Sequence, residues 1–378
     1  MMKFVNELGE KDLQDKKVLL RADLDVPVKN GRIAEEFRVR AQGETLNCLV
    51  DMGARVLMVA HLGHDVSGAS FNPVAEQLGE ILGLTLTLVP LSELGALDNL
   101  FDASQVLLLD NIRQDKREVE NDKGFAAELA KGFNLYVNDA FAVCHRDHTS
   151  VSAITELLPS YAGFLMKKEM EKLSEAIAAP AAGKILVIGG AKISTKLPVI
   201  KNFLAKSEKI LVGGAIANSF FKARGIKIGA SVVDDTAADI SDPKIVLPER
   251  VIVTDDKTGK SGATSMPVGD IAPSQMIVDI CPEFAEKFAG IIKGSKMVIW
   301  NGPMGIAEVD EFARGTKVVA EAVASAPHSI VGGGDTIAAT DKLGLLDRFG
   351  FVSTGGGAML EFLAGNKLPG LEALGYYK

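Results

Sequence analysis

Short aliphatic runs recur along the 378 residues, and segments of helical length separate most of them. Because these runs are apolar on both faces, they are typical of strands in a parallel sheet that helices cover on each side. They occupy residues 17–24, 55–60, 84–89, 105–109 and 135–137 in the first half, and 184–188, 209–212, 251–253, 276–280, 296–300, 328–331 and 349–352 in the second. Amphipathic stretches such as 40–52, 72–82 and 312–324 are the expected helices. The pattern predicts an α/β fold.

The length of the chain predicts two lobes, because it exceeds the usual size of one compact core. Residues 157–180 have the composition of a long helix, which is a stiffer connector than a Gly/Ser linker. We therefore expect a first domain of residues 1–156 together with the C-terminal residues 366–378, a linker helix over 157–180 and a second domain of residues 181–365.

Charge and composition narrow the class of protein. A net charge of −8 argues against a general nucleic-acid binder, which usually has a basic excess. The sequence has no apolar run long enough to span a bilayer, and its first residues lack the apolar core of a signal peptide. The three cysteines are odd in number and widely spaced, which favours a reducing compartment. We expect a cytoplasmic protein that binds neither nucleic acid nor membrane.

The residues that follow the strands differ between the two halves. Polar and basic groups follow the strands of the first half, whereas glycines follow those of the second. Ligands of open α/β sheets bind beyond the carboxyl ends of the strands. Gly and Asp also end strands simply because they form turns, which is a sufficient explanation for any single site. The repeated division predicts two ligands, one in each lobe.

Glycine-rich turns in the second half predict a nucleotide site. Tight glycine turns leave backbone N–H groups free to approach phosphate, and the helix that follows adds a positive dipole. Residues 332–336, GGGDT, have this form: Asp335 can reach Mg²⁺ and Thr336 can donate to a phosphate oxygen. Residues 353–357, STGGG, precede another helix and can hold the transferring phosphoryl group.

Two lysines extend this prediction. Lys192 follows the Gly189–Gly190 turn, and Lys196 lies one turn further, so both ammonium groups would share one helical face. Such cations would offset the charge of a triphosphate. Lysines at this spacing more often form a solvated face, but the preceding strand and glycine turn favour the binding site.

A second phosphate motif is excluded on its spacing. Residues 251–261, VIVTDDKTGKS, resemble a strand that enters a P-loop. That motif needs glycine at the position of Thr254, because the loop geometry depends on it. No strand-linked G-x-G-x-x-G is present either.

Arginines in the first half predict an anion site. Arg38, Arg40, Arg113 and Arg146 lie near expected strand ends or the helices that follow them. Arginine suits bidentate contacts with phosphate and carboxylate, so the cluster fits a small substrate that has both groups. Individually, each arginine could equally be a surface charge.

The histidines leave a metal site open as an alternative. His61 and His64 form one pair, and His145 and His148 form another next to Cys144. A zinc ion could use such ligands, but structural zinc prefers a closed set of four, and the nearby arginines would repel a cation.

In order and across nearly the whole chain, these segments resemble the phosphoglycerate kinase family. The segments are VLLRADLDVPV (18–28), FRVRA (37–41), HLG (61–63), DNIR (110–113), NDAF..CHRDH (138–148), GGAKISTK (189–196), GGAIANSF (213–220), NGPMG (301–305), GGGDT (332–336) and STGGGA (353–358). Any one of them is a weak signal, and ten in sequence are specific.

The resemblance implies a monomer of two Rossmann-like lobes that transfers a phosphoryl group reversibly from 1,3-bisphosphoglycerate to ADP, giving 3-phosphoglycerate and ATP in glycolysis or gluconeogenesis, with Mg²⁺ accompanying ATP or ADP. It assigns the catalytic contacts to Arg38, Lys192, Gly334 and Gly357. It assigns phosphoglycerate binding to Asp23, Asp25, Arg38, His61, His64, Arg113 and Arg146. It assigns nucleotide binding to Lys192, Lys196, Gly213, Gly214, Asn301, Gly305, Glu308, Gly333, Gly334, Asp335 and Thr336, with Asp335 as the Mg²⁺ ligand.

Several positions depart from the family pattern. Asp25 replaces Asn, and a carboxylate that faces an anionic substrate is unfavourable unless it is protonated or paired. His64 and Asp65 replace Arg-Pro, which removes a permanent positive charge. Cys281 stands where the family has Gly in the nucleotide pocket. Two alternatives to the family reaction therefore stay open: a divergent paralogue with another acceptor acid, and a non-catalytic nucleotide-binding protein on the same fold.

Overall fold

The computed structural model describes the chain except for residues 64–67, 235, 237, 239, 261 and 378. The chain divides into two compact units. The first contains Met1–Glu171 and Lys367–Lys378, and the second contains Lys172–Asn366. Within the described residues, no helix is long and apolar enough to cross a membrane.

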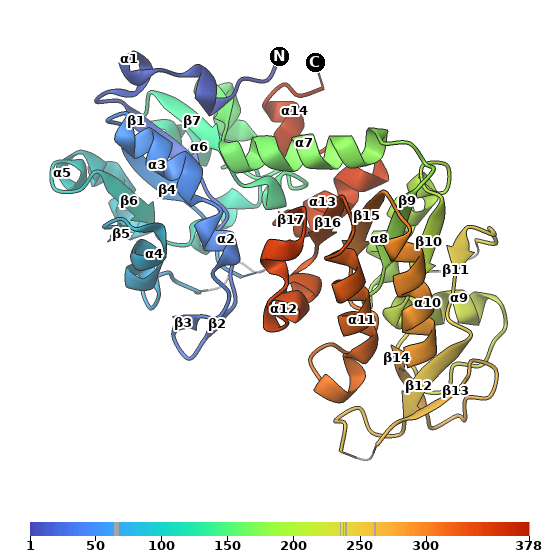
Figure 1. Cartoon of the computed structure of the whole chain (residues 1–378). Helices are drawn as coiled ribbons and strands as arrows, with labels where there is room; N and C mark the ends of the chain where they lie inside the picture. The colour runs from blue at the N-terminus through green and yellow to red at the C-terminus, as the bar shows by residue number, and fades with distance from the viewer. Residues whose placement is uncertain (64–67, 235, 237, 239, 261, 378) are drawn as a thin grey trace. The chain divides into compact units, whose positions relative to one another are not determined.

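A six-stranded sheet forms the centre of the first unit, in the order β5-β6-β4-β1-β7-β8, with every neighbouring pair parallel (Figure 1). Its strands are β1 (Lys17–Arg21), β4 (Arg55–Val59), β5 (Thr87–Val89), β6 (Val106–Leu109), β7 (Leu135–Asn138) and β8 (Ser160–Ala162). The unit also has a hairpin of β2 (Val28–Lys29) and β3 (Arg32–Ile33), and helices α1 (Glu10–Leu13), α2 (Phe37–Arg40), α3 (Gly43–Asp51), α4 (Ala75–Leu82), α5 (Leu97–Phe101), α6 (Lys123–Ala130) and α14 (Pro369–Ala373).

Both faces of this sheet are buried, as the apolar runs predict. On β1, Val18 and Leu20 point to one face and Leu19 to the other, and all three side chains are at most 1% exposed. The expected helix over residues 40–52 is two helices, α2 and α3, which are separated by residues 41 and 42.

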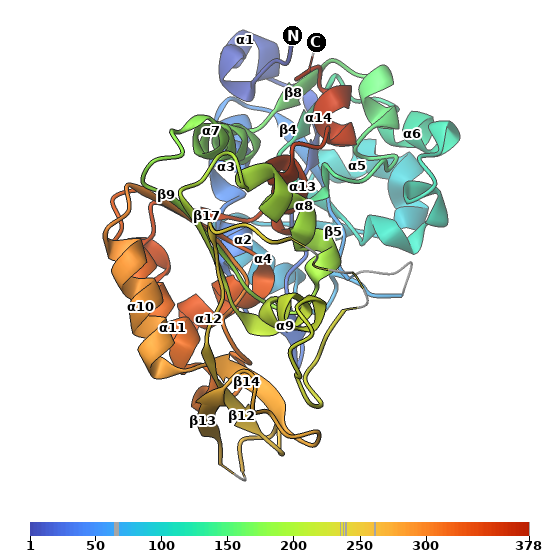
Figure 2. The same ribbon diagram turned by 90° about the vertical axis from the view of Figure 1, so that its right-hand side faces the viewer.

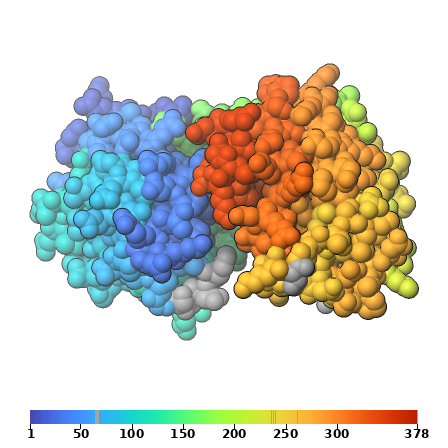
Figure 3. Space-filling model, turned by 60° about the horizontal axis from the view of Figure 1, so that its bottom comes forward, coloured from blue at the N-terminus to red at the C-terminus, as the bar shows by residue number. Residues whose placement is uncertain are grey.

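The second unit repeats this design with a six-stranded parallel sheet in the order β11-β10-β9-β15-β16-β17. Its strands are β9 (Lys184–Ile188), β10 (Lys209–Val212), β11 (Ile245–Val246), β15 (Met297–Asn301), β16 (Ser329–Gly332) and β17 (Phe351–Ser353). Its helices are α8 (Ile193–Phe203), α9 (Gly214–Ala223), α10 (Pro282–Lys293), α11 (Arg314–Val323), α12 (Gly334–Lys342) and α13 (Gly356–Ala364). Helices α10 and α11 lie side by side (Figure 2) and supply much of the orange surface of this unit in Figure 3.

Two of the predicted strands do not belong to the parallel sheet. β12 (Arg250–Thr254) and β14 (Met276–Ile280) pair antiparallel with each other, and β13 (Thr264–Pro267) pairs with β12 (Figure 2). An aliphatic run of five residues fits either kind of sheet. The connection between the strands determines their orientation. The chain returns from β12 directly through β13, without the helix that a parallel crossover needs.

The predicted linker helix over residues 157–180 begins later than expected. Residues 160–162 form the edge strand β8 beside β7, and α7 runs from Phe164 to Ala178. In the first unit, the Thr45 hydroxyl and the Asp139 carboxylate accept hydrogen bonds from the N–H groups of Phe164 and Met166. These long-range caps determine where the helix starts, and the local sequence contains no sign of them.

Buried charges complement the dipole of α7 at both ends. Burial raises the pKa of Asp139, at the positive N-terminus of the helix, to about 6. Toward the other end, in the second unit, the Lys184 ammonium donates to the carbonyl oxygens of Ala176 and Ile177 at 2.6 and 3.2 Å. A carboxylate at the N-terminus and an ammonium at the C-terminus both stabilise a helix.

The last residues of the chain belong to the first unit. The N–H of Gly370 donates to the carbonyl oxygen of Cys144 at 2.9 Å. A side chain at residue 370 would meet the Cys144 and Val151 atoms within 3.0 Å, so this contact requires glycine.

Leu186 tests the buried position of β9. Its side chain is fully buried on an interior strand, so we expect Leu186→Ala to lower the free energy of unfolding of the second unit by about 2–5 kcal/mol. Val232→Ala, at a side chain 63% exposed in the same unit, should change it by less than about 0.5 kcal/mol. Urea unfolding followed by the fluorescence of Trp300, the single tryptophan, measures both. Equal effects would contradict the placement of β9.

Candidate functional site

The parallel sheet of the first unit brings the predicted anion-binding residues to one edge. Neighbouring strands β6, β4, β1 and β7 all end there. Arg113, His61, Asp23 and Asn138 stand at or just beyond those ends, and all four side chains are buried. The predicted gathering of polar groups at the strand ends is therefore present within this unit.

Arg38 lies beside two aspartates at this edge. The Arg38 guanidinium donates to the carbonyl oxygen of Asp25 at 3.1 Å and lies 3.6 Å from a carboxylate oxygen of Asp23. Neither Asp23 oxygen accepts a hydrogen bond within the described residues. Burial raises the pKa of Asp23, and the charge of Arg38 opposes that rise.

Asp25 is paired in the way that its position requires. One of its oxygens accepts the N–H of Gly63 at 2.8 Å, and the other lies 3.6 Å from Nε2 of His61. The backbone donor stabilises the charged carboxylate, so this departure from the family pattern is compatible with the local fold.

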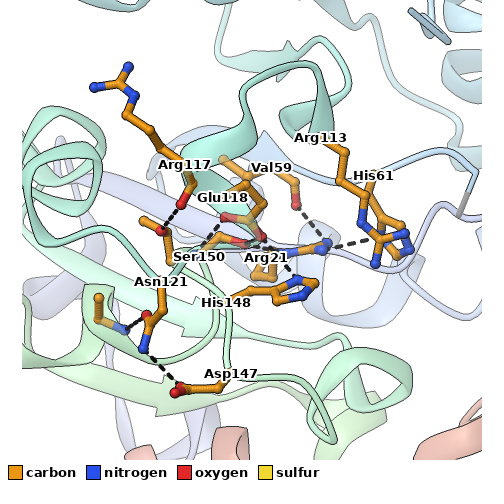
Figure 4. Close-up of polar contacts among 12 residues, drawn as sticks. Arg21, Val59, His61, Arg113, Arg117, Glu118, Asn121, Asp147, His148 and Ser150 are labelled. Atoms are coloured by element: carbon orange, nitrogen blue, oxygen red, sulfur yellow. Dashed lines mark hydrogen bonds and ion pairs between the residues drawn. The ribbon is translucent and has the colours of Figure 1, made fainter. Parts of the chain in front are cut away.

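His61 and Arg113 lie in the same buried cluster. His61 contacts the Arg21 guanidinium at 3.1 Å (Figure 4), and burial together with Arg21 holds its pKa well below 6.5. Arg113 donates to the carbonyl oxygen of Gly63 at 2.6 Å, and burial and the charges of Arg21 and Arg146 lower its pKa to about 10. The electrostatic effect of Arg146 places it near the cluster. His64 lies outside the described residues.

The zinc alternative finds no support in the described part of the chain. It contains no group of three or more Cys, His, Asp or Glu side chains that could hold a metal ion. The Cys144 thiol is fully buried 3.8 Å from the Met166 sulfur, and burial raises its pKa. The thiol is therefore protonated and packed in the core rather than available as a thiolate ligand.

In the second unit, the glycine loops follow β9, β10, β15, β16 and β17, and all five strands end at one edge of the sheet. Gly334 and Gly357 lie in the first turns of α12 and α13, where backbone N–H groups have no partner within the helix. Gly333 precedes α12 with a φ of 97°, a conformation that favours glycine. Both helix starts can therefore present N–H groups to an anion.

Asn301 and Thr336 connect two of these loops. The Thr336 hydroxyl accepts the N–H of Gly302 at 2.7 Å. The Asn301 side chain packs so closely on Gly333 that a side chain at 333 would come within 3.0 Å of it. These contacts hold the loop after β15 against the start of α12.

The two lysines do not share one face as predicted. Lys192 is exposed and precedes α8 as its N-cap, whereas Lys196 is only 8% exposed and donates to the carbonyl oxygen of Gly189. Burial lowers the pKa of Lys196 to about 8, although the charge of Asp335 opposes this. The prediction assumed that residue 192 is already part of the helix. In the structure, Lys192 belongs to the turn after β9, and the helix begins at Ile193.

A pocket of about 750 Å³, partly open to solvent, lies among these loops. Of the predicted nucleotide-binding residues, it is lined by Gly214, Gly305, Glu308 and Asp335, and Gly190 of the turn after β9 also lines it. Its other walls are mostly apolar and come from α9 and the strands β12 and β14. Apolar walls beside polar loops are typical of a pocket for a planar ring with a charged tail.

Cys281 does not line this pocket. It precedes α10 as the N-cap and is fully buried, while its neighbour Ile280 reaches the pocket. The replacement of glycine at this position therefore does not place a thiol against the ligand.

Sequence reasoning missed Asp279, which also lines the pocket. Its carboxylate accepts the N–H groups of Gly315 and Ile280 at 2.7 and 2.8 Å, and burial raises its pKa to about 7. It thereby joins β14 to the first turn of α11. The sequence signal that could have indicated Asp279 is a single Asp within an aliphatic run, VDI.

The excluded P-loop segment has another structure. The Thr254 hydroxyl donates to the carbonyl oxygen of Gly262 at 2.9 Å and accepts the N–H of Asp256 at 3.0 Å. These bonds close a turn after β12, and no helix starts in residues 255–260.

The chain is similar to known proteins over its whole length. The family model described as "Phosphoglycerate kinase" matches residues 8–366. The phosphoglycerate kinase of Moorella thermoacetica is 39% identical, with 97% of this chain and 98% of that protein covered. A cytosolic phosphoglycerate kinase of Triticum aestivum is 39% identical, with 98% of each covered. The structure of phosphoglycerate kinase from Coxiella burnetii has a TM-score of 0.82 and 34% identity, with all of both chains covered.

Fold and matches together define the class: a phosphotransferase with a carboxyl group as acceptor, built from two parallel-sheet α/β units. The chain belongs to the phosphoglycerate kinase family. The predictions of fold class, family and enzyme class are confirmed.

Lys196 should destabilise the second unit at neutral pH. The folded state loses its proton near pH 8 and the unfolded state near 10.5, so stability rises with pH between these values. We expect Lys196→Met to raise the free energy of unfolding at pH 7 by roughly 1–3 kcal/mol and by less at pH 10. Urea unfolding at both values measures this. Lys192→Met, at an exposed site, is the control and should change little. If the gain in the free energy of unfolding of Lys196→Met were equally large at pH 10, the ammonium of Lys196 would not be buried as described.

Proposed function

We propose that the chain transfers a phosphoryl group reversibly between 1,3-bisphosphoglycerate and ADP, giving 3-phosphoglycerate and ATP. The observation that carries this proposal is that the two units have different groups at their strand ends. The first has buried arginines and a histidine at its strand ends, and the second has a pocket bordered by glycine loops. Family membership agrees with it.

In the first unit, we propose that the basic groups bind the phosphate and carboxylate of phosphoglycerate. Arg38, His61, His64, Arg113 and Arg146 would supply the donors. Asp23, whose oxygens are buried without a donor, would accept the substrate hydroxyl. Asp25 would line the same site, with its charge balanced by the Gly63 N–H.

In the second unit, we propose that the pocket takes the nucleoside, with Gly213 and Gly214 along the adenine and Glu308 at the ribose. Lys192, Lys196, Asn301, Thr336 and the N–H groups at Gly333, Gly334 and Gly357 would bind the phosphates, beside Gly305. Support comes from the exposed ammonium of Lys192 and from the two open helix starts.

Asp335 fits the proposed Mg²⁺ of the nucleotide. Its carboxylate is exposed and lines the pocket. Mg²⁺ usually binds one or two carboxylates together with substrate phosphates and water. When bound, the ion would neutralise charge on the phosphate oxygens.

The chemistry needs few protein groups. The acceptor carboxylate is already ionised at neutral pH, so no general base has to remove a proton. The residues instead position two anions and stabilise charge on the transferring group, which we assign to Arg38, Lys192, Gly334 and Gly357.

A cytosolic location is proposed from the wheat relative, whose name states it. The monomeric state and the lack of nucleic-acid or membrane partners stay predictions of the sequence and the resemblance.

The proposal is tested by ADP formation from MgATP and 3-phosphoglycerate, in a coupled assay that consumes the bisphosphoglycerate. We expect turnover, and a fall in kcat of about 10²- to 10³-fold in Lys192→Ala, because a cation that stabilises the transferring charge is lost. Lys201→Ala, at an exposed site on the helix that follows Lys192, is the matched control. No turnover above background with MgATP still bound would overturn the proposal and favour another acceptor or a non-catalytic role.

Asp25 should weaken acceptor binding. Asn at this position keeps an acceptor for the Gly63 N–H but removes a negative charge beside His61. We expect Asp25→Asn to lower KM for 3-phosphoglycerate about fivefold, with KM for MgATP unchanged. Steady-state kinetics with each substrate varied measures this. Exposed Asp51, changed to Asn, is the control in the same unit. An increased KM would mean that the Asp25 charge supports the site.

A further inference from the structure

Arg21 lies at the centre of a buried polar chain behind the acceptor site (Figure 4). It is the last residue of β1, and its side chain is fully buried. One terminal nitrogen donates to the carbonyl oxygen of Ala22 at 2.6 Å, and the other contacts Nδ1 of His61 at 3.1 Å. The register of the sheet explains this contact, because Arg21 pairs with Val59 two residues before His61.

On the side of Arg21 away from His61, Ser150 and Glu118 continue this series of hydrogen bonds. Nε of Arg21 donates to the Ser150 hydroxyl at 2.9 Å, and that hydroxyl donates to the Glu118 carboxylate at 2.7 Å. The second oxygen of Glu118 accepts the backbone N–H of Ser150 at 2.9 Å. Glu118 is fully buried at the end of a short helical turn. Burial raises the pKa of Glu118, and the charge of Arg21 opposes that rise.

These bonds can run in only one direction. A guanidinium has donors and no acceptor, so Nδ1 of His61 must be the acceptor and cannot hold a proton. A neutral imidazole then has its proton on Nε2. Burial and Arg21 keep the pKa of His61 well below 6.5, which agrees with a neutral ring. Nε2–H is thereby the ring donor that faces Asp25.

Glu118 also compensates the charge of Arg21 without touching it. The two residues form no direct ion pair, and the Ser150 hydroxyl bridges them. A buried cation needs a nearby anion and full hydrogen bonding, since an unpaired one is costly. Arg21 therefore stays in the orientation that Ser150 and Glu118 determine.

We propose that Glu118 and Ser150 are positioning residues for the transfer reaction, which orient Arg21 so that it holds His61 as the Nε2–H tautomer that donates to the acceptor substrate. The proposal rests on the proposed function for the identity of the acceptor, but the tautomer of His61 can be measured without turnover.

The first measurement is the tautomer of His61 in the full-length wild-type chain. Long-range ¹H–¹⁵N NMR distinguishes protonated from unprotonated ring nitrogens, the chain has only five histidines, and His61→Asn identifies the signal. We expect Nε2 protonated and Nδ1 unprotonated at pH 7. A wild-type ring protonated on Nδ1 overturns the proposal at once, whatever the variants do.

Ser150→Ala then removes the bridge and keeps the backbone contact to Glu118. We expect a mixture of His61 tautomers, KM for 3-phosphoglycerate raised about fivefold, and kcat and KM for MgATP unchanged within about twofold. Ser150→Thr restores the hydroxyl and should restore both readouts. Ser152→Ala is the matched control, since its hydroxyl has no partner within the described residues.

Glu118→Gln provides a second, independent change. Glutamine has one acceptor where the carboxylate has two, so one Ser150 bond is lost. We expect the same tautomer mixture, whereas Glu120→Gln, at an exposed site nearby, should resemble wild type. If Ser150→Ala and Glu118→Gln both keep the pure Nε2–H tautomer of His61 and the wild-type KM for 3-phosphoglycerate, the positioning role is wrong. A wild-type enzyme that has the expected tautomer but does not use 3-phosphoglycerate refutes the proposed function alone.

Discussion

The parallel pairing of strands that are buried on both faces is the constraint on which this protein depends. In each unit, parallel strands direct their carboxyl ends to one edge, so residues far apart in sequence meet there. Arg21 and His61 contact each other only because β1 and β4 pair in register, and Gly302 meets Thr336 only because β15 lies beside β16. The sheets thereby bring residues from separate motifs together at two candidate sites.

Different kinds of hydrogen-bond donor lie at the strand ends of the two units. The first uses buried guanidinium groups, and their desolvation is offset by internal carboxylates such as Glu118 and Asp23. The second has backbone N–H groups at helix starts, which need no counter-charge, and the buried ammonium of Lys196 beside them. This difference agrees with the sequence, in which polar and basic groups follow the strands of the first unit and glycines follow those of the second.

Much of this design follows from the sequence, because apolar runs and strand-end motifs are local signals. They predict the parallel sheets, the family and the residues gathered at each edge. Three features escape local reasoning. The antiparallel pairing of β12 and β14 depends on how the chain returns, the start of α7 on caps from Thr45 and Asp139, and the burial of Lys196 on the turn after β9. The first two are decided by contacts between distant segments, and the third by a turn whose geometry the residue types alone do not specify.

Glu118 shows the same limit within the site. In the sequence it is one charged residue in the run DKREVEND, where a solvated position is the simplest expectation. Only the fold places it fully buried beneath Ser150 and Arg21. A buried carboxylate is tolerated where hydrogen bonds and a nearby cation compensate it. The burial of Glu118 therefore implies that Arg21 is charged and held in a fixed orientation. In the positioning role proposed above, the ring nitrogen that His61 presents to the acceptor is determined by Glu118, three residues behind it.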